Sequence, residues 1–390
     1  MECFVTRLKR IFVATSTLVI SSAAAHAEPN VVTSIKPVHS LVSGVMAGVG
    51  KPTLIVEGAG SPHTYALKPS QAKSLESADV VFWVGPEIEA FLEKPINTVA
   101  TKAKSVELLD TKGLTKLPYR EGGAFEAHEE HGHDDHKKAD AHKDHDHDDH
   151  KKADAHKDHD HDDHKKADAH KDHDDHKKAD AHKDHDHDDH KKTDAHKDHD
   201  HDDHKKASAK HDDHAHGEFD AHVWLDPQNA KALVHRIEHV LAEADPANAA
   251  KYKANAEKLE GKLDTLTKEV AADLKSVKNK GFVVFHDAYQ NFEKRFGVKA
   301  VGSITVSPEV MPGAKRVKEI RNKVKSLDVT CVFAEPQFEP KLVSTVTQGT
   351  KAKSGVLDPL GATLQDGPDL YFALIRNMAN SIRDCLSEAS

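Results

Sequence analysis

Short runs of hydrophobic residues in this chain alternate with stretches in which hydrophobic positions recur every three or four residues. The first run, 31–35, predicts a strand, and a helical stripe follows it from Pro37, which suits a helix N1 position. The same alternation predicts further strands at 53–56, 79–85, 105–110, 282–285, 299–304, 330–334 and 355–357, and a last helix at about 369–388. This order of elements predicts an α/β fold with two parallel-sheet lobes.

The stretch between the two groups of strands predicts one long helix. Residues 248–278 contain no proline, and Leu259, Leu263 and Leu266 begin a stripe that continues to Leu274. At 1.5 Å per residue such a helix is about 45 Å long. An ordinary surface helix is the simpler interpretation, but a helix of this length between two α/β units favours a rigid spine. A spine limits hinge motion between the lobes.

The first residues have the pattern of a secretory signal peptide. Arg7, Lys9 and Arg10 precede an apolar run at 11–20, and Ala25-His26-Ala27 supplies small residues for cleavage after Ala27. The apolar run is about ten residues long, far short of the roughly 20 that span a bilayer. No later stretch is long and apolar enough to be a span, so we expect an exported chain without a membrane anchor.

Cysteine usage agrees with export. Cys3 leaves with the signal peptide, so the mature chain keeps Cys331 and Cys385. Two cysteines far apart in an exported chain predict one structural disulfide. Neither has a partner at C-x-x-C spacing, which disfavours a cysteine-based zinc site.

The middle of the chain is a charged repeat. The unit HKKADAHKDHDHDD begins at His136 and recurs from His150, His164, His176 and His190, with the unit at His164 two residues short. Alanine is its only apolar residue, so it cannot bury a core and the segment is expected to be disordered. The net charge of −10 disfavours nucleic-acid binding.

These patterns predict six segments. They are a signal peptide at 1–27, an N-terminal lobe at 28–123, the repeat at 124–218, a return to the N-terminal lobe at 219–247, a linker helix at 248–279, and a C-terminal lobe at 280–390.

Candidate metal ligands follow predicted strands. His63 lies in a loop after one strand, His286 closes another, and Asp358 follows a third. With His222, just after the repeat, they make a set of three imidazoles and a carboxylate that suits Zn²⁺. Ligands bind at the carboxyl ends of strands in open α/β sheets. A closed four-ligand shell leaves no position for activated water, which favours transport over catalysis.

Simpler interpretations exist for each of these residues. A single loop histidine is usually exposed or a cap, and Asp358 before Pro359 can simply initiate a turn. His39, His235 and His239 lie within helical stretches, and we expect them to be ordinary helical residues.

Several segments together resemble one family. GAGSPH (58–63), YALKPS (65–70), VFWVGPE (81–87), HVWLDP (222–227), FHDAY (285–289), AEPQF (334–338) and LDPLG (357–361) occur in this order. The set resembles the ZnuA-type zinc receptors, which belong to the metal-specific (cluster 9) solute-binding proteins of ABC importers. The resemblance covers nearly all of the mature chain except the repeat.

The resemblance implies more than a fold of two lobes on a long backbone helix. It implies that His63, His222 and His286 are zinc ligands, that a histidine-rich loop lies beside the cleft, and that Cys331 pairs with Cys385. It also implies a monomeric periplasmic receptor without enzymatic activity that carries Zn²⁺ as transported ligand. Its partners would be a membrane permease with its cytoplasmic ATPase, with a periplasmic zinc chaperone as a further candidate.

The chain departs from the family at one position. Some zinc receptors carry a glutamate immediately before the first histidine, where this chain has Pro62, which cannot ligate. Asp358 is then the best candidate for the fourth ligand, and water competes with it.

The repeat can be a solvated linker, but its spacing also suits weak metal sites. Imidazoles interleaved with carboxylates bind Zn²⁺, Cu²⁺ and Ni²⁺. Ordering a flexible chain costs entropy, so these sites should be weaker than the cleft. The candidates are His142, His145, His147, His150, His156, His159, His161 and His164. The role we expect is scavenging under starvation, handing metal to the cleft, or sensing its abundance.

Other functions remain in competition. A metallohydrolase needs an open metal position and a general base. A storage or buffering protein needs only the repeat and leaves the strand-end ligands unexplained. A manganese receptor of the same architecture is the nearest alternative, although three nitrogen ligands favour zinc and two carboxylates would favour manganese.

Overall fold

The structure is a computed structural model of the chain, and it describes residues 28–120, 125, 219–305, 308, 312–326 and 329–387. The predicted signal peptide, and the repeat with the eight histidines proposed as weak sites, lie outside the described residues. No helix among those described is both long and apolar enough to cross a membrane.

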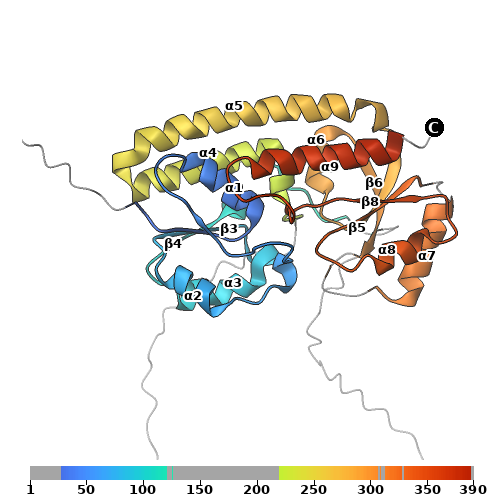
Figure 1. Ribbon diagram of the computed structural model, residues 1–390, viewed down its shortest axis with the longest axis horizontal. Helices are drawn as coiled ribbons and strands as arrows, with labels where there is room; N and C mark the ends of the chain where they lie inside the picture. Colours follow the sequence, from blue (N-terminus) through green and yellow to red (C-terminus); the bar gives the residue numbers. More distant parts are fainter. Residues whose placement is uncertain are drawn as a thin grey trace, which may run out of the picture. The chain divides into compact units, whose positions relative to one another are not determined.

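The N-terminal lobe is a four-stranded parallel sheet in the order β2-β1-β3-β4 (Figure 1). Its strands are β1 (Val31–Thr33), β2 (Thr53–Leu54), β3 (Val80–Trp83) and β4 (Lys104–Glu107), and its helices are α1 (Lys36–Val45), α2 (Pro69–Glu76) and α3 (Pro86–Thr98). The hydrophobic stripe that begins at Pro37 is the buried face of α1. The predicted strand at 105–110 is shorter than expected, because residues Leu108–Asp110 form a 3-10 turn after β4.

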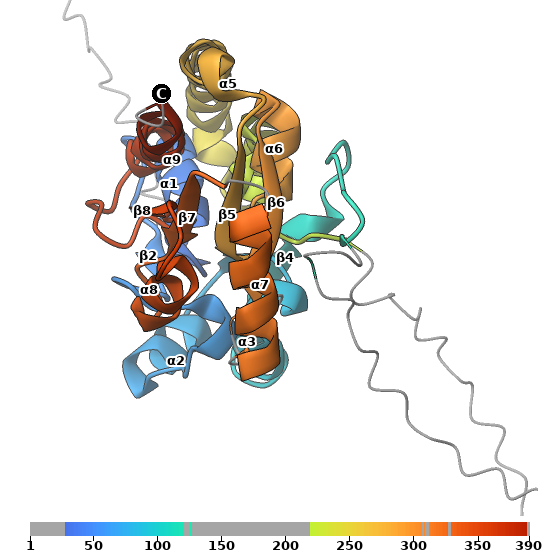
Figure 2. The same cartoon turned by 90° about the vertical axis from the view of Figure 1, so that its right-hand side faces the viewer.

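The C-terminal lobe repeats this plan with the order β6-β5-β7-β8, all parallel. Its strands are β5 (Gly281–His286), β6 (Lys299–Thr305), β7 (Cys331–Ala334) and β8 (Lys353–Val356). Helices α7 (Ala314–Ser326) and α8 (Lys341–Thr347) pack on β6 and on β7 and β8 respectively (Figure 2), and α6 (Gln290–Phe296) follows β5. The predicted α/β class with two parallel sheets is confirmed.

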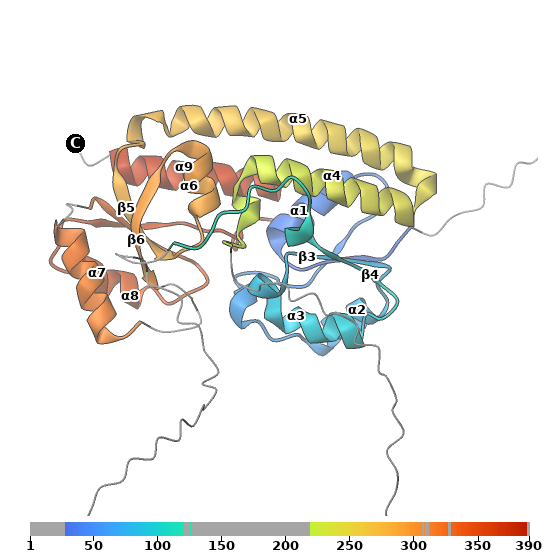
Figure 3. The ribbon, with the colours of Figure 1, turned by 180° about the vertical axis from the view of Figure 1, so that it is seen from behind.

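The predicted spine is α5 (Ala249–Asp273), which packs along α4 (Pro227–Ala244) and α9 (Leu370–Ser387) (Figures 1 and 3). Leu259, Leu263, Leu266 and Val270 are its buried stripe. The helix is shorter than the predicted 248–278, because its end tightens into a 3-10 turn at Lys275–Val277 before β5 begins. Its 25 residues correspond to about 38 Å.

The two lobes share a hydrophobic core. One cluster of buried side chains runs from β1 and α1 through α4 and α5 to β5 and α9. A smaller cluster lies between the C-terminal sheet and helices α7 and α8. Tyr371 of α9 donates from its hydroxyl to the Trp224 carbonyl at 2.6 Å, and its N–H donates to Ser40 Oγ at 3.0 Å. The shared core therefore holds the lobes at a defined separation, which is what a metal site between them requires.

The predicted disulfide joins Cys331 in β7 to Cys385 in α9. It closes a loop with a sequence separation of 54, worth about 4 kcal/mol in the chain-entropy model, from which native strain subtracts. We expect no free thiol in the mature protein denatured without reductant, and a lower midpoint of chemical unfolding after reduction. Two titratable thiols in the unreduced protein would contradict the pairing.

A buried carboxyl closes the end of β3. Glu89 is fully buried; its Oε1 accepts a 2.6 Å hydrogen bond from Ser34 Oγ, and its Oε2 accepts from the N–H groups of Val84 and Gly85 at 3.0 Å. Burial outweighs these hydrogen bonds and raises the pKa of Glu89 to about 7. The carboxyl therefore remains largely protonated in the folded protein under mildly acidic conditions.

The raised pKa of Glu89 predicts a pH-dependent stability. The folded state binds the carboxyl proton of Glu89 more tightly than the unfolded state does. The stabilisation from this proton is therefore fully present below about pH 4.5 and is lost as pH rises through about 7. The full loss is on the order of 3 kcal/mol. Glu89→Gln mimics the neutral acid and does not titrate. As pH rises across this range, the free energy of unfolding of the variant should therefore increase relative to that of the unchanged protein. Parallel pH profiles for the two metal-free proteins would contradict the assignment.

Candidate metal centre

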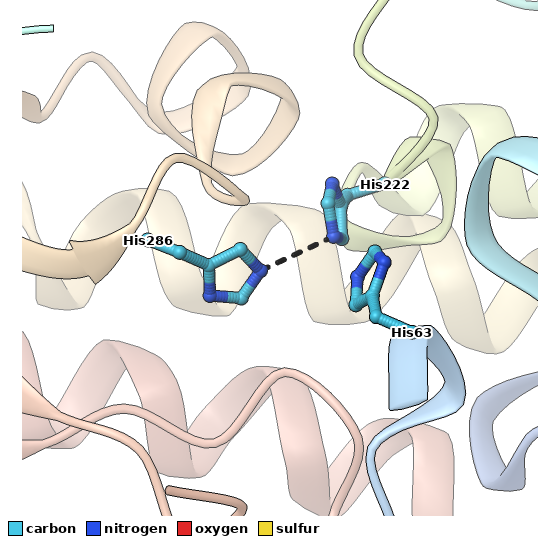
Figure 4. Close-up of side chains that lie close together, drawn as sticks. All are labelled: His63, His222 and His286. Atoms are coloured by element: carbon cyan, nitrogen blue, oxygen red, sulfur yellow. Dashed lines mark hydrogen bonds between the residues drawn. The ribbon is translucent and has the colours of Figure 1, made fainter. Parts of the chain in front are cut away.

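Three histidines from separate parts of the chain meet between the lobes (Figure 4). His63 lies in a 3-10 turn (Pro62–Thr64) after β2, His222 precedes another (Val223–Leu225), and His286 is the last residue of β5. One ligand atom from each can be chosen so that all lie within 4.8 Å of one another. The Nε2 atoms of His222 and His286 are 3.4 Å apart. The structure thus brings together the three histidines that the sequence singled out.

The surroundings of the three rings are largely apolar. His222 and His286 are 8% and 3% exposed, and His63 is half-buried. Pro62, Trp224, Phe338 and Leu360 line the small cavity beside them. Apolar walls lower the local dielectric, so a dication held by the rings would be attracted more strongly than in water.

Two buried carboxylates orient two of the rings. Nδ1 of His222 is 2.7 Å from Asp220 Oδ1, and Nδ1 of His286 is 2.7 Å from Glu335 Oε1. An Nδ1–H that donates to a carboxylate leaves Nε2 as the lone-pair atom, and such partners also raise ligand basicity. The Nε2 atoms are the ones that approach each other in the centre.

Sequence reasoning assigned no role to Asp220 or Glu335. Asp220 lies two residues before His222, a local signal that could have been used. Glu335 follows β7, and β7 is the neighbour of β5, which ends at His286. Only the order of the strands in the sheet brings the Glu335 carboxylate next to the His286 ring.

Protonation of the three rings differs. Burial, followed by the neighbouring rings, holds the pKa of His63 well below its usual value, and it lowers the pKa of His222 to about 3. Burial also acts to lower the pKa of His286, but the carboxylates of Glu335, Asp287 and Asp220 together outweigh it and raise that pKa. His63 and His222 are therefore neutral near pH 7 with lone pairs available to a metal.

Asp358 is not part of this three-histidine cluster. Its carboxylate accepts hydrogen bonds from the N–H groups of Leu360, Gly361 and Ala362 at 3.1, 2.9 and 2.6 Å, and from Gln337 Nε2 at 2.9 Å. The side chain organises the turn after β8, which was the simpler interpretation of an aspartate before proline. A role as fourth ligand would require it to give up part of this hydrogen bonding.

Two described stretches that flank the repeat segment come together beside the metal centre. Pro118 and Phe219 form an isolated antiparallel bridge, and the Asp220 N–H donates to the Leu117 carbonyl at 2.8 Å. Figure 3 shows the chain after β4 running across to the C-terminal lobe. Residues 117–118, before the repeat, therefore lie next to residues 219–220, which directly precede His222.

Arg120 ends the continuous described stretch before the repeat, and it binds two acidic residues of the C-terminal lobe. Its guanidinium donates to both oxygens of Asp287 and, at 2.9 and 3.0 Å, to both oxygens of Glu293. The Phe125 ring lies 4.0 Å from its Cζ. Asp287 directly follows His286 in sequence, so this ion pair connects the base of the repeat with one candidate ligand.

Further bonds tie the turn after β8 to the N-terminal half. Trp224 Nε1 donates to the Pro359 carbonyl at 2.9 Å. Lys36 of α1, which is 5% exposed, donates to the Leu364 carbonyl at 2.8 Å and lies 3.1 Å from Asp366. The centre is therefore supported from both lobes.

Comparisons with known proteins agree with this geometry. The family model described as zinc-uptake complex component A, periplasmic, matches residues 31–385. A high-affinity zinc uptake system protein of Brucella suis is 55% identical over 367 residues, covering 94% of each chain, and one of Yersinia pestis is 33% identical over 373 residues, covering 95% of each. A solved ZnuA structure superposes with a TM-score of 0.62 at 18% identity, covering 92% of this chain and all of that one, which shows a shared fold.

Proposed function

This chain belongs to the zinc-uptake complex component A family, and from that membership we propose that it is the high-affinity receptor that captures Zn²⁺ for an ABC-type importer of the inner membrane. The convergence of His63, His222 and His286 is the observation that carries the proposal. The protein acts in the periplasm, binds and releases zinc, and catalyses no reaction.

We propose that Zn²⁺ binds to the Nε2 atoms of His222 and His286 and to a ring nitrogen of His63. Three imidazole nitrogens in an apolar cavity suit zinc better than manganese, which prefers carboxylate oxygens. For the fourth position the candidates remain Asp358 and water. The four hydrogen bonds that Asp358 already accepts favour water, because a water ligand leaves the turn after β8 intact.

The partners of the receptor follow from its role. The permease of the importer, driven by its cytoplasmic ATPase, receives the metal. We further propose a monomer that exchanges zinc with a periplasmic chaperone, and we retain the segment boundaries that the sequence predicts: a mature chain that begins after Ala27, and a repeat at 124–218 that supplies weaker metal sites.

Deleting residues 124–218 separates a receptor from a storage protein. Apart from Phe125 at its start, alanine is the only apolar residue type in the segment, so it cannot form a core of its own and the deleted form should fold and keep one tight zinc per molecule. The weaker sites should vanish with the repeat. In the full chain these sites should weaken as pH falls through about 6.5, where imidazoles protonate and stop ligating. Calorimetric titration of both forms at neutral and mildly acidic pH measures this.

A folded deletion form without any zinc binding would overturn the receptor proposal, and storage would become the better function. Competitive titration of the same form with zinc and manganese, with the bound metal identified by mass spectrometry, tests the manganese alternative. If the protein binds manganese in preference to zinc, it is a manganese receptor of the same architecture.

A further inference from the structure

Two exposed histidines lie on the outer face of α4, away from the metal centre. His235 and His239 are four residues apart in one continuous helix, and their side chains are 76% and 58% exposed. Helical residues at this spacing lie on the same face, one turn apart. Two histidines four residues apart on one helix face can hold Zn²⁺ in common, because both imidazoles can approach the same ion.

Each of these imidazoles has a carboxylate on its Nδ1 side. Nδ1 of His239 lies 3.3 Å from Glu243 Oε1, and Nδ1 of His235 lies 4.0 Å from Glu238 Oε2. Both distances are longer than the 2.7 Å hydrogen bonds of Asp220 and Glu335 in the metal centre, so these carboxylates support the imidazoles by their charge. With Nδ1 facing a carboxylate, Nε2 of each ring is the atom more available to a metal.

A hollow of about 360 Å³ adjoins the pair and is lined by both histidines together with Asp110 and Thr111. Thr111 is 7% exposed, and its Oγ1 is buried without a hydrogen-bond partner among the described residues. A hydrated metal ion at the rim would place its water ligands near the carboxylate of Asp110, whereas the Thr111 hydroxyl oxygen has almost no accessible surface and contributes no ligand.

The charges around the hollow bear on its affinity. Lys112 and Arg236 also line it and disfavour a cation, but both side chains are exposed and can turn into solvent. Two imidazoles also make a smaller ligand set than the three of the metal centre. Both features indicate weaker binding than between the lobes.

We propose that His235 and His239 form a second, weaker Zn²⁺ site on the outer face of α4, with Nε2 of both rings as ligands. The site exchanges metal with the surrounding solution independently of the metal centre. Its two histidines belong to α4 and not to the repeat segment of the sequence.

Histidine footprinting of the full chain tests this site residue by residue. Diethyl pyrocarbonate acylates an unbound imidazole nitrogen, and peptide mass spectrometry counts the adduct at His235 and at His239. A chelator buffer at pH 7.5 fixes the free zinc concentration. Zinc that binds to the repeat therefore does not change the free zinc concentration around α4. Zinc should protect both rings over the same concentration range, above the range that fills the metal centre, and Mg²⁺ should protect neither.

Variants distinguish a shared ion from two separate ones. In His235→Ala the zinc concentration for half-protection of His239 should rise by at least about tenfold, because the remaining ring is a single ligand; removal of supporting partners alone typically costs 10–100-fold. Glu243→Gln should weaken protection of both rings, and Lys112→Met should strengthen it. Both positions are exposed, so these variants should fold, which circular dichroism checks. Unchanged half-protection of His239 in His235→Ala would overturn the proposal.

Discussion

Replacing His63, His222 or His286 by alanine should lower the zinc affinity of the cleft by more than about 100-fold, since loss of a supporting partner of a ligand already costs 10–100-fold. Each variant should also lose the thermal stabilisation that follows when metal binds only the native state, about 2.7 kcal/mol at 100 times the dissociation constant. Competition with a chelator of known affinity, at pH 7.5, measures the loss.

The matched controls are His235→Ala and His239→Ala, which remove exposed imidazoles from the same protein. Neither should change the affinity of the tight site, because both rings lie on the outer face of α4. Equal losses at the two sets of positions would show that zinc is held elsewhere. The losses of zinc affinity in Asp220→Asn and Glu335→Gln should be smaller than those of the ligand variants and larger than those of the controls. These two residues orient ligands without being ligands.

Arg120→Met should destabilise the metal-free protein by about 3–5 kcal/mol, the cost of removing one partner from a buried ion pair. Asp287 and Glu293 are 7% and 6% exposed, and the substitution leaves both carboxylates without their guanidinium. Zinc should also leave faster, because Asp287 adjoins His286 and no longer has a fixed partner. Chemical denaturation measures the first effect, and stopped-flow transfer of zinc to a chelator measures the second.

Two further variants serve as comparisons for Arg120→Met. Arg120→Lys keeps the charge but loses the bidentate geometry, so it should recover only part of the stability. Arg376→Met removes a guanidinium from an exposed pair with Glu269 and should cost no more than about 1 kcal/mol. If Arg120→Met releases zinc at the unchanged rate, the ion pair supports the fold without acting on the metal centre.

The sequence predicts the strands, the spine and the three histidines because each leaves a local pattern. Hydrophobic runs, the stripe along α5 and the loop motifs around His63 and His222 are all short-range features. The contact of Glu335 with His286 spans 49 residues, and that of Arg120 with Asp287 spans 167. Such contacts depend on strand order and on how the lobes meet, which no local pattern encodes.

Asp358 illustrates another limit of sequence reasoning. An aspartate after a strand and before a proline suits both a metal ligand and a turn cap, and the residues around it are the same in either case. The difference lies in the direction of its side chain. Three backbone N–H groups of the turn after β8 determine that direction here.

The pairing of Pro118 with Phe219 has a consequence for how the gene can change. Whole repeat units of 14 residues, such as the one from His136 to the next at His150, can be gained or lost by slippage during replication without shifting this pairing. Even a doubling of the segment adds only about 0.6 kcal/mol of loop-closure entropy. The number of accessory imidazoles can thus vary between lineages while the cleft stays the same, so selection can adjust zinc capacity and zinc affinity separately.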